Sequence, residues 1–149
     1  IAQIYELHDL DRSPVDTTRT PAPDSTSQVA LEVRADLGHA VLTCTRIGAD
    51  LGAEVHTRVA SIVRGGIDVV YADLPLDQLE LSWAVDVLDE EGFIFSGVLP
   101  LAQRGIDMVR YQRLGDIVVL REEIHLKHPF GQNLLDYVLA QRAELEPRT

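Results

Sequence analysis

The fold is decided by residues 67–97, IDVVYADLPLDQLELSWAVDVLDEEGFIFSG. The first part of this stretch, residues 67–72, is mostly β-branched and apolar, as expected for a buried strand. The strand should end at Leu74-Pro75, because the residue before a proline is disfavoured in a helix. Gly92 then closes a helical pattern, and Phe93 begins a second apolar run. The stretch therefore predicts a strand, a turn, a helix and another strand.

The helix within this stretch has an apolar face and an acidic face. Asp77 followed three residues later by Glu80 is typical of a helix start, so we expect Asp77 to cap the helix. The apolar face repeats at helical spacing: Leu81, Ala84, Val85 and Leu88. The acidic residues on the other side are most simply a solvated surface.

Towards the N-terminus, the pattern predicts a hairpin followed by a second helix. Residues 29–34 alternate as a half-buried strand does, residues 36–39 turn the chain, and residues 40–47 return as a more apolar strand. The helix after residue 52 has one apolar face and ends at Gly65-Gly66. That face consists of Leu51, Val55, Val59, Ile62 and Val63.

Towards the C-terminus, the pattern predicts a second hairpin and a last helix. The strand after Gly97 continues to Pro100, residues 103–105 form a turn, and residues 106–114 form an antiparallel partner. A further apolar run covers residues 117–120. A helix over residues 130–145 carries a narrow apolar stripe that can dock on the sheet or on a partner.

Residues 1–28 are predicted to be an N-terminal strand and linker segment, and residues 29–149 a single globular domain. Residues 1–7 suit a strand or the tail of a helix, whereas residues 9–27 are rich in Asp, Ser, Thr and Pro and read as a linker. Such a long linker is unusual inside a compact domain. We therefore expect residues 1–10 to belong to, or pack against, something upstream, and the chain to be part of a longer protein.

The composition excludes several classes of partner. A net charge of −11 and a pI near 4.7 argue against nucleic acid and anionic membranes, which require a cationic face. No apolar run approaches the length of a membrane span. A single cysteine, Cys44, excludes an intrachain disulfide framework and suits a reducing compartment. We expect a cytoplasmic protein.

The central stretch resembles the second half of the GNAT (acyl-CoA N-acyltransferase) fold. The resemblance rests on a strand, a turn, a helix and then Gly92-Phe93, with Gly97 four residues after the phenylalanine. The segments at residues 97–101 and 128–142 resemble, in particular, the C-terminal GNAT-like domain of larger bacterial proteins. The resemblance and the order of the elements together predict an α/β fold with a mixed, mostly antiparallel sheet flanked by helices.

The resemblance also implies a site for acetyl-CoA or another acyl-CoA between the hairpin and the next helix. Glycines and backbone N–H groups at such a helix start can bind a pyrophosphate. The implied cofactor-binding residues are Arg46, Ile47, Gly48, Leu51 and Gly52. The family signature is degenerate here, because Ala49 and Leu51 stand where glycine or a small residue is expected and Asp50 would repel a pyrophosphate. An ordinary strand-to-helix turn is the alternative.

The catalytic acid that the resemblance implies is missing. Many GNAT enzymes carry a tyrosine four residues before the glycine of the Gly-Phe pair, and this chain has Leu88 there, which cannot transfer a proton. Tyr71 and Tyr111 are candidate proton donors in place of that tyrosine, although each is more simply an aromatic residue packed in the core or on a face of the sheet. Where the family often carries an asparagine, this chain offers Asp77 and Gln78. No catalytic residue is assigned.

The remaining reactive side chains have simpler interpretations. His125 and His128 lack the acidic or cysteine partners that would complete a metal site, so we expect no metal. Cys44 is most simply a small, buried apolar side chain, and His56 is most simply a histidine exposed to solvent.

Two functions stay open. The first is an acyl-CoA-dependent N-acyltransferase, with residues 48–52 holding the pyrophosphate and amides of the preceding strand polarising the thioester. The second is a GNAT-like domain without the chemistry, acting as an interaction or ligand-sensing module. Its partners would be an upstream domain of the same chain or a second copy.

Overall fold

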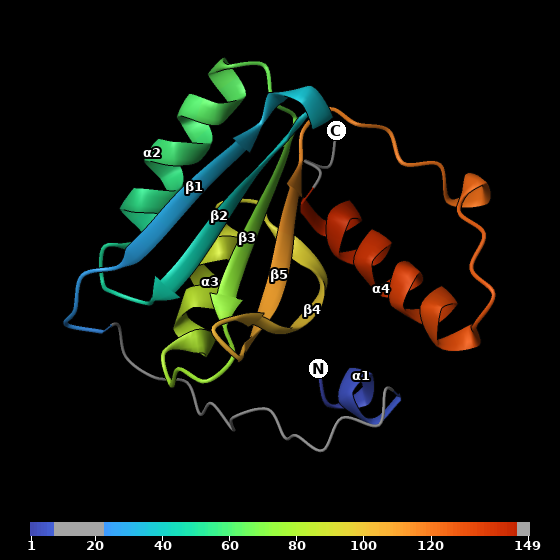
Figure 1. The fold of residues 1–149 in the computed structure, drawn as a ribbon. Helices are drawn as coiled ribbons and strands as arrows, with labels where there is room; N and C mark the ends of the chain where they lie inside the picture. The colour runs from blue at the N-terminus through green and yellow to red at the C-terminus, as the bar shows by residue number, and fades with distance from the viewer. Residues whose placement is uncertain (8–22, 146–149) are drawn as a thin grey trace.

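The computed structural model describes residues 1–7 and 23–145, which form a five-stranded mixed sheet flanked by helices (Figure 1). The strand order is β1-β2-β3-β5-β4, and β2 and β3 are parallel whereas the other neighbours are antiparallel. This confirms the predicted α/β class. The elements are α1 (Ala2–Leu7), β1 (Gln28–Arg34), β2 (His39–Arg46), α2 (Leu51–Arg64), β3 (Val69–Pro75), α3 (Leu81–Glu90), β4 (Ile94–Gln103), β5 (Ile106–Leu114) and α4 (Pro129–Leu145), with 3-10 turns at Ala35–Leu37 and Arg121–Glu123.

Helix α2 makes the crossover that a parallel pair of strands requires. Its buried residues are Leu51, Val55, Val59 and Ile62. Val63 was predicted on the same face, but its side chain is 44% exposed. At about 100° per residue, Val63 lies about 120° from Leu51 around the helix, so it reaches the flank and not the core.

Strand β1 is an edge strand and is more exposed than the alternation predicted. It pairs with β2 through the predicted hairpin, in which Gly38 takes a positive φ of 69°. Leu31 is 39% exposed and Val33 48% exposed. The prediction of a half-buried strand was wrong because β1 lies at the margin of the sheet, where one side lacks a neighbouring strand.

Helix α3 begins later than the sequence suggested. Glu80 stands at its N-cap without a side-chain hydrogen bond, so the prediction that Asp77 caps it was wrong. The backbone N–H of Leu76 donates to the carbonyl of Asp107, which prolongs the pairing of β3 with β5. The chain therefore still follows the sheet at Leu76, and residues 77–80 form the connection.

The two faces of the sheet differ in character. Paired residues share a face, and one face carries Leu42, Ala72 and Val109 into the main apolar core together with α2 and α3. Figure 1 shows α3 behind β3. The opposite face carries polar groups, among them Asp73 and Arg110.

Residues 1–7 contain a helix, α1 (Figure 1), and the side chain of Tyr5 on this helix is packed into the core of the domain. Tyr5 is 3% exposed, and its hydroxyl donates a hydrogen bond of 2.8 Å to Asp107 Oδ2 on β5. Of the predicted linker, residues 9–22 lie outside the described residues. Residues 117–120 form no strand, and Val118 is 79% exposed. No helix within the described residues is both long and apolar enough to cross a membrane.

Candidate functional site

The turn between β2 and α2, where the acyl-CoA site was predicted, lies beside a gap in the sheet. The pairing of β2 with β3 ends at Thr43 and Asp73. Beyond that point the side chain of Gln78 joins β2: its Oε1 accepts the N–H of Ile47 at 2.9 Å, and its Nε2 donates to the carbonyl of Thr45 at 2.9 Å. The carboxamide thus replaces a neighbouring strand.

Residues 25–27 pack against the same turn. The N–H of Gly48 donates to Ser27 Oγ at 3.0 Å, and the N–H of Ala49 donates to the carbonyl of Ser25 at 2.8 Å. In return, the N–H of Ser27 donates to Asp50 Oδ1 at 2.6 Å, and Ser25 Oγ donates to the carbonyl of Ile47 at 3.0 Å. The consecutive amides of residues 47–49 therefore all donate to groups of the chain itself.

The two predicted glycines have different roles. A Cβ atom on Gly48 would lie 2.3–2.4 Å from backbone atoms of Ser25, Thr26 and Ser27, so only glycine lets the two segments meet. A Cβ atom on Gly52 would make an ordinary contact of 3.5 Å with Val87 Cγ1. The space beside Gly48 is thus filled by the protein's own backbone.

The other predicted cofactor residues face the interior or contact residues 25–27. The side chains of Ile47 and Leu51 are each 1% exposed and belong to the core. The guanidinium of Arg46 donates from Nε to the carbonyl of Thr26 at 2.9 Å. The structure brings these residues together at one turn, with the charge of Arg46 directed to the neighbouring segment.

The turn also carries a negative charge. The backbone N–H and the hydroxyl of Ser27 hydrogen-bond to Asp50 and lower the pKa of its carboxyl. Asp50 is therefore a carboxylate at neutral pH, next to the amides that a pyrophosphate would need.

A partly buried ion pair lies on the polar face of the sheet and was not predicted from the sequence. Arg110 binds Asp73 through both carboxylate oxygens, Nε to Oδ1 at 2.7 Å and Nη2 to Oδ2 at 2.8 Å. The guanidinium carbon lies 4.8 Å from the ring centroid of Tyr71, which in turn contacts His39 edge to face. A carboxylate within the apolar run of β3 was the one signal available from the sequence.

The substitutes considered for a catalytic acid are committed to packing. Tyr71 supports Arg110, and Tyr111 is buried against Phe95, with ring centroids 6.0 Å apart. Burial, with smaller effects from Asp89 and Tyr137, raises the pKa of Tyr111. Leu88, at the position where the resemblance implied a tyrosine, is fully buried.

The remaining polar candidates do not assemble into a reactive group. Burial raises the pKa of Cys44 to about 11, and its thiol donates to the carbonyl of Arg46. His56 is exposed and pairs with Glu91 at 3.2 Å. Within the described residues, no cluster of three His, Cys, Asp or Glu side chains is placed to hold a metal ion.

The amides of the turn are bound by Gln78, Ser25 and Ser27. Gln78 was noted in the sequence but given no role, and the two serines fell within a predicted linker. No protein-family model matches the sequence, and a search of curated proteins found no significant match.

Proposed function

We propose that this chain is a GNAT-like domain without transferase activity, which acts as an interaction or ligand-sensing module of a larger cytoplasmic protein. One observation carries the proposal: the amides of Ile47, Gly48 and Ala49 donate to Gln78, Ser27 and Ser25. An acyl-CoA would have to break these hydrogen bonds before its phosphates could use the same donors.

The charge of the turn supports the same function. CoA is a polyanion, the chain carries a net charge of −11, and the Asp50 carboxylate lies at the start of α2. Arg46, the cation at the turn, already donates to Thr26. Repulsion therefore adds to the cost of displacing residues 25–27.

An acyl-CoA-dependent N-acyltransferase is the second candidate, and the gap between β2 and β3 favours it. Backbone groups of Thr45 and Ile47 face a side chain there and not a strand. An extended ligand that carries amide groups could take the place of Gln78. This function would need residues 25–27 to leave the turn and a proton donor other than Leu88.

Titration of the purified chain with acetyl-CoA, followed by its melting temperature, separates the two functions. A ligand that binds only the folded state must raise the melting temperature. We expect no saturable rise with acetyl-CoA, free CoA or ATP, and no release of thiol from acetyl-CoA with amine acceptors. A saturable rise specific to acetyl-CoA that Arg46→Ala abolishes would overturn the proposal.

A Ser25→Ala/Ser27→Ala double variant sharpens this test. It removes both serine hydroxyls while keeping the backbone, so the N–H of Gly48 loses its acceptor. If the wild-type chain binds no acetyl-CoA only because the serines occupy the turn, the variant should gain binding. We expect it to gain none, because the backbone of residues 25–27 still fills the space beside Gly48 and because Asp50 and Gln78 remain.

A further inference from the structure

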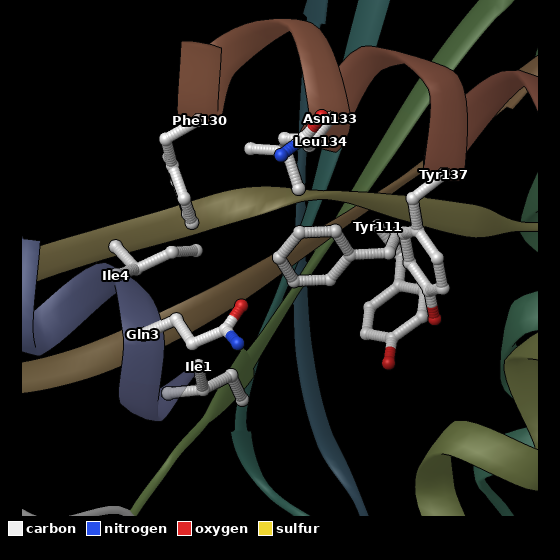
Figure 2. Close-up of a pocket in the computed structure, with 9 residues that line it drawn as sticks. Ile1, Gln3, Ile4, Tyr111, Phe130, Asn133, Leu134 and Tyr137 are labelled. Carbon is white, nitrogen blue, oxygen red and sulfur yellow. The ribbon is translucent and has the colours of Figure 1, made fainter.

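A cavity of about 440 Å³ lies between α1, the β4–β5 edge of the sheet and α4 (Figure 2). The N-terminal segment contributes Ile1, Gln3 and Ile4 to its lining. The sheet contributes Phe95 and Tyr111, and α4 contributes Leu134 and Tyr137. The volume falls within the range of about 300–1,000 Å³ that is usual for small-molecule sites. The cavity lies apart from the β2–α2 turn.

Aromatic rings give the cavity its shape. The ring of Phe95 packs edge to face on Tyr111, at 6.0 Å between centroids and 89° between planes. It makes a similar contact with Tyr137, at 6.4 Å and 67°. Flat apolar surfaces set at steep angles favour a planar aromatic guest, which can stack on one ring and meet another at its edge.

The polar side chains of the cavity are uncharged. Figure 2 shows the hydroxyls of Tyr111 and Tyr137 on one side of it and the amide of Gln3 pointing towards the rings. Among the described residues that line the cavity, none is Asp, Glu, Lys, Arg or His. An ionic ligand would therefore lose its hydration without gaining a counter-charge from any of these side chains.

Tyr111 is the most buried of the residues that carry these polar groups. The residue is 8% exposed, and burial raises the pKa of its phenol, so the hydroxyl keeps its proton at neutral pH. A protonated hydroxyl on a residue that lines the cavity is suited to donate to a ligand.

We propose that this cavity binds an uncharged, planar aromatic molecule of fused-ring size that carries a hydrogen-bond acceptor. The inference rests on the ligand-sensing form of the proposed function and gives that function a site. Phe95, Tyr111 and Tyr137 supply the aromatic surface, and Tyr111 donates to the acceptor.

Calorimetric titration of the chain with 2-acetylnaphthalene tests the proposal. We expect saturable binding at one site and at least tenfold weaker binding of 2-naphthoate, which has a similar shape but a negative charge. Tyr111→Phe should weaken binding of 2-acetylnaphthalene about threefold to tenfold, as expected for one hydrogen bond. The same substitution should leave the affinity for 2-ethylnaphthalene, which has no acceptor, unchanged.

Matched variants locate the site. Asn133→Trp places a large ring at the cavity and should abolish binding, whereas Ala140→Trp, at an exposed position of the same helix, should not. Tyr71→Phe, on the polar face of the sheet, is the control for Tyr111→Phe. Circular dichroism establishes that each variant is folded.

The outcomes are distinct. Absence of saturable 2-acetylnaphthalene binding to the folded wild-type chain, or binding that Asn133→Trp leaves intact, overturns the inference about the cavity. If acetyl-CoA also fails to bind in a parallel titration, the proposed non-catalytic function survives as an interaction module. Saturable binding of acetyl-CoA would instead overturn the proposed function, whatever the naphthalene result.

Discussion

Gly48 shows how one residue decides what the β2–α2 turn can hold. The space that a side chain would fill is taken by the backbone of residues 25–27, and this segment accepts a hydrogen bond from the amide of Ala49 that a phosphate would otherwise use. A glycine at a strand-to-helix turn suggested a place for a phosphate, and the same glycine also suits close packing of two backbone segments. The sequence pattern does not distinguish these two uses.

We expect Gly48→Ala to lower the free energy of unfolding by about 1–3 kcal/mol, because its Cβ would meet backbone atoms at 2.3–2.4 Å. Gly52→Ala is the matched control. It lies in α2 with room for a methyl group and should be neutral or stabilising by up to about 1 kcal/mol. Urea unfolding of both variants measures the difference. Equal effects would show that residues 25–27 do not hold the turn.

Cys44 gives a pH dependence with a defined sign. Burial raises the thiol pKa from 9.0 to about 11, so the folded chain keeps its proton where the unfolded chain loses it. Stability should therefore be unaffected by this group below pH 9 and should fall between about pH 9 and 11. Urea unfolding at pH 8 and pH 10 should show a smaller decline in Cys44→Ala than in the wild-type chain. Parallel declines in the two proteins would contradict the prediction.

At the scale of elements, strands and helices followed from local patterns, and their ends did not. The hairpin of β4 and β5, the helix α4 and the stop of α3 at Gly92 all appear where predicted, because periodicity and glycine act locally. The start of α3 was misplaced because the chain stays hydrogen-bonded to β5 through Leu76. That bond joins residues far apart in the sequence, so a capping pattern could not foresee it.

Gln78 provides the prediction that belongs to this scale. Gln78→Ala removes both hydrogen bonds that tie the connection after β3 to the end of β2. We expect a loss of about 1–2 kcal/mol in the free energy of unfolding and faster hydrogen exchange at the amide of Ile47. Gln132→Ala, which removes an exposed hydrogen bond to Leu126, is the control and should change little. Unchanged protection of Ile47 in Gln78→Ala would count against a bridging role.

At the scale of the whole molecule, the sequence predicted the fold class but not which distant parts meet. The mixed sheet was expected from the order of the elements, and it formed. The cavity could not be predicted, because Gln3, Tyr111 and Tyr137 come from three separate parts of the chain and share no pattern. The approach of residues 25–27 to the β2–α2 turn was hidden for the same reason.

The docking of α1 is testable at this scale. Tyr5→Phe removes the hydroxyl that donates to Asp107 while keeping the buried ring. A hydrogen bond to a carboxylate contributes about 1.5–3 kcal/mol, so amides of α1 should exchange at least about tenfold faster. Amides of β3 should keep their protection. Tyr137→Phe is the control, and equal exchange rates for α1 in the two variants would argue against this anchor.

Because Ile1, Gln3 and Ile4 line the cavity, binding of a molecule in the cavity and docking of α1 on the sheet are linked equilibria. A molecule that binds only while α1 is docked makes undocking harder by its own binding free energy, and undocking α1 expels that molecule to the same extent. The short helix therefore has the geometry of a latch. A partner that pulls α1 away from the sheet would therefore release the bound molecule. Conversely, the bound molecule would make α1 harder to pull away.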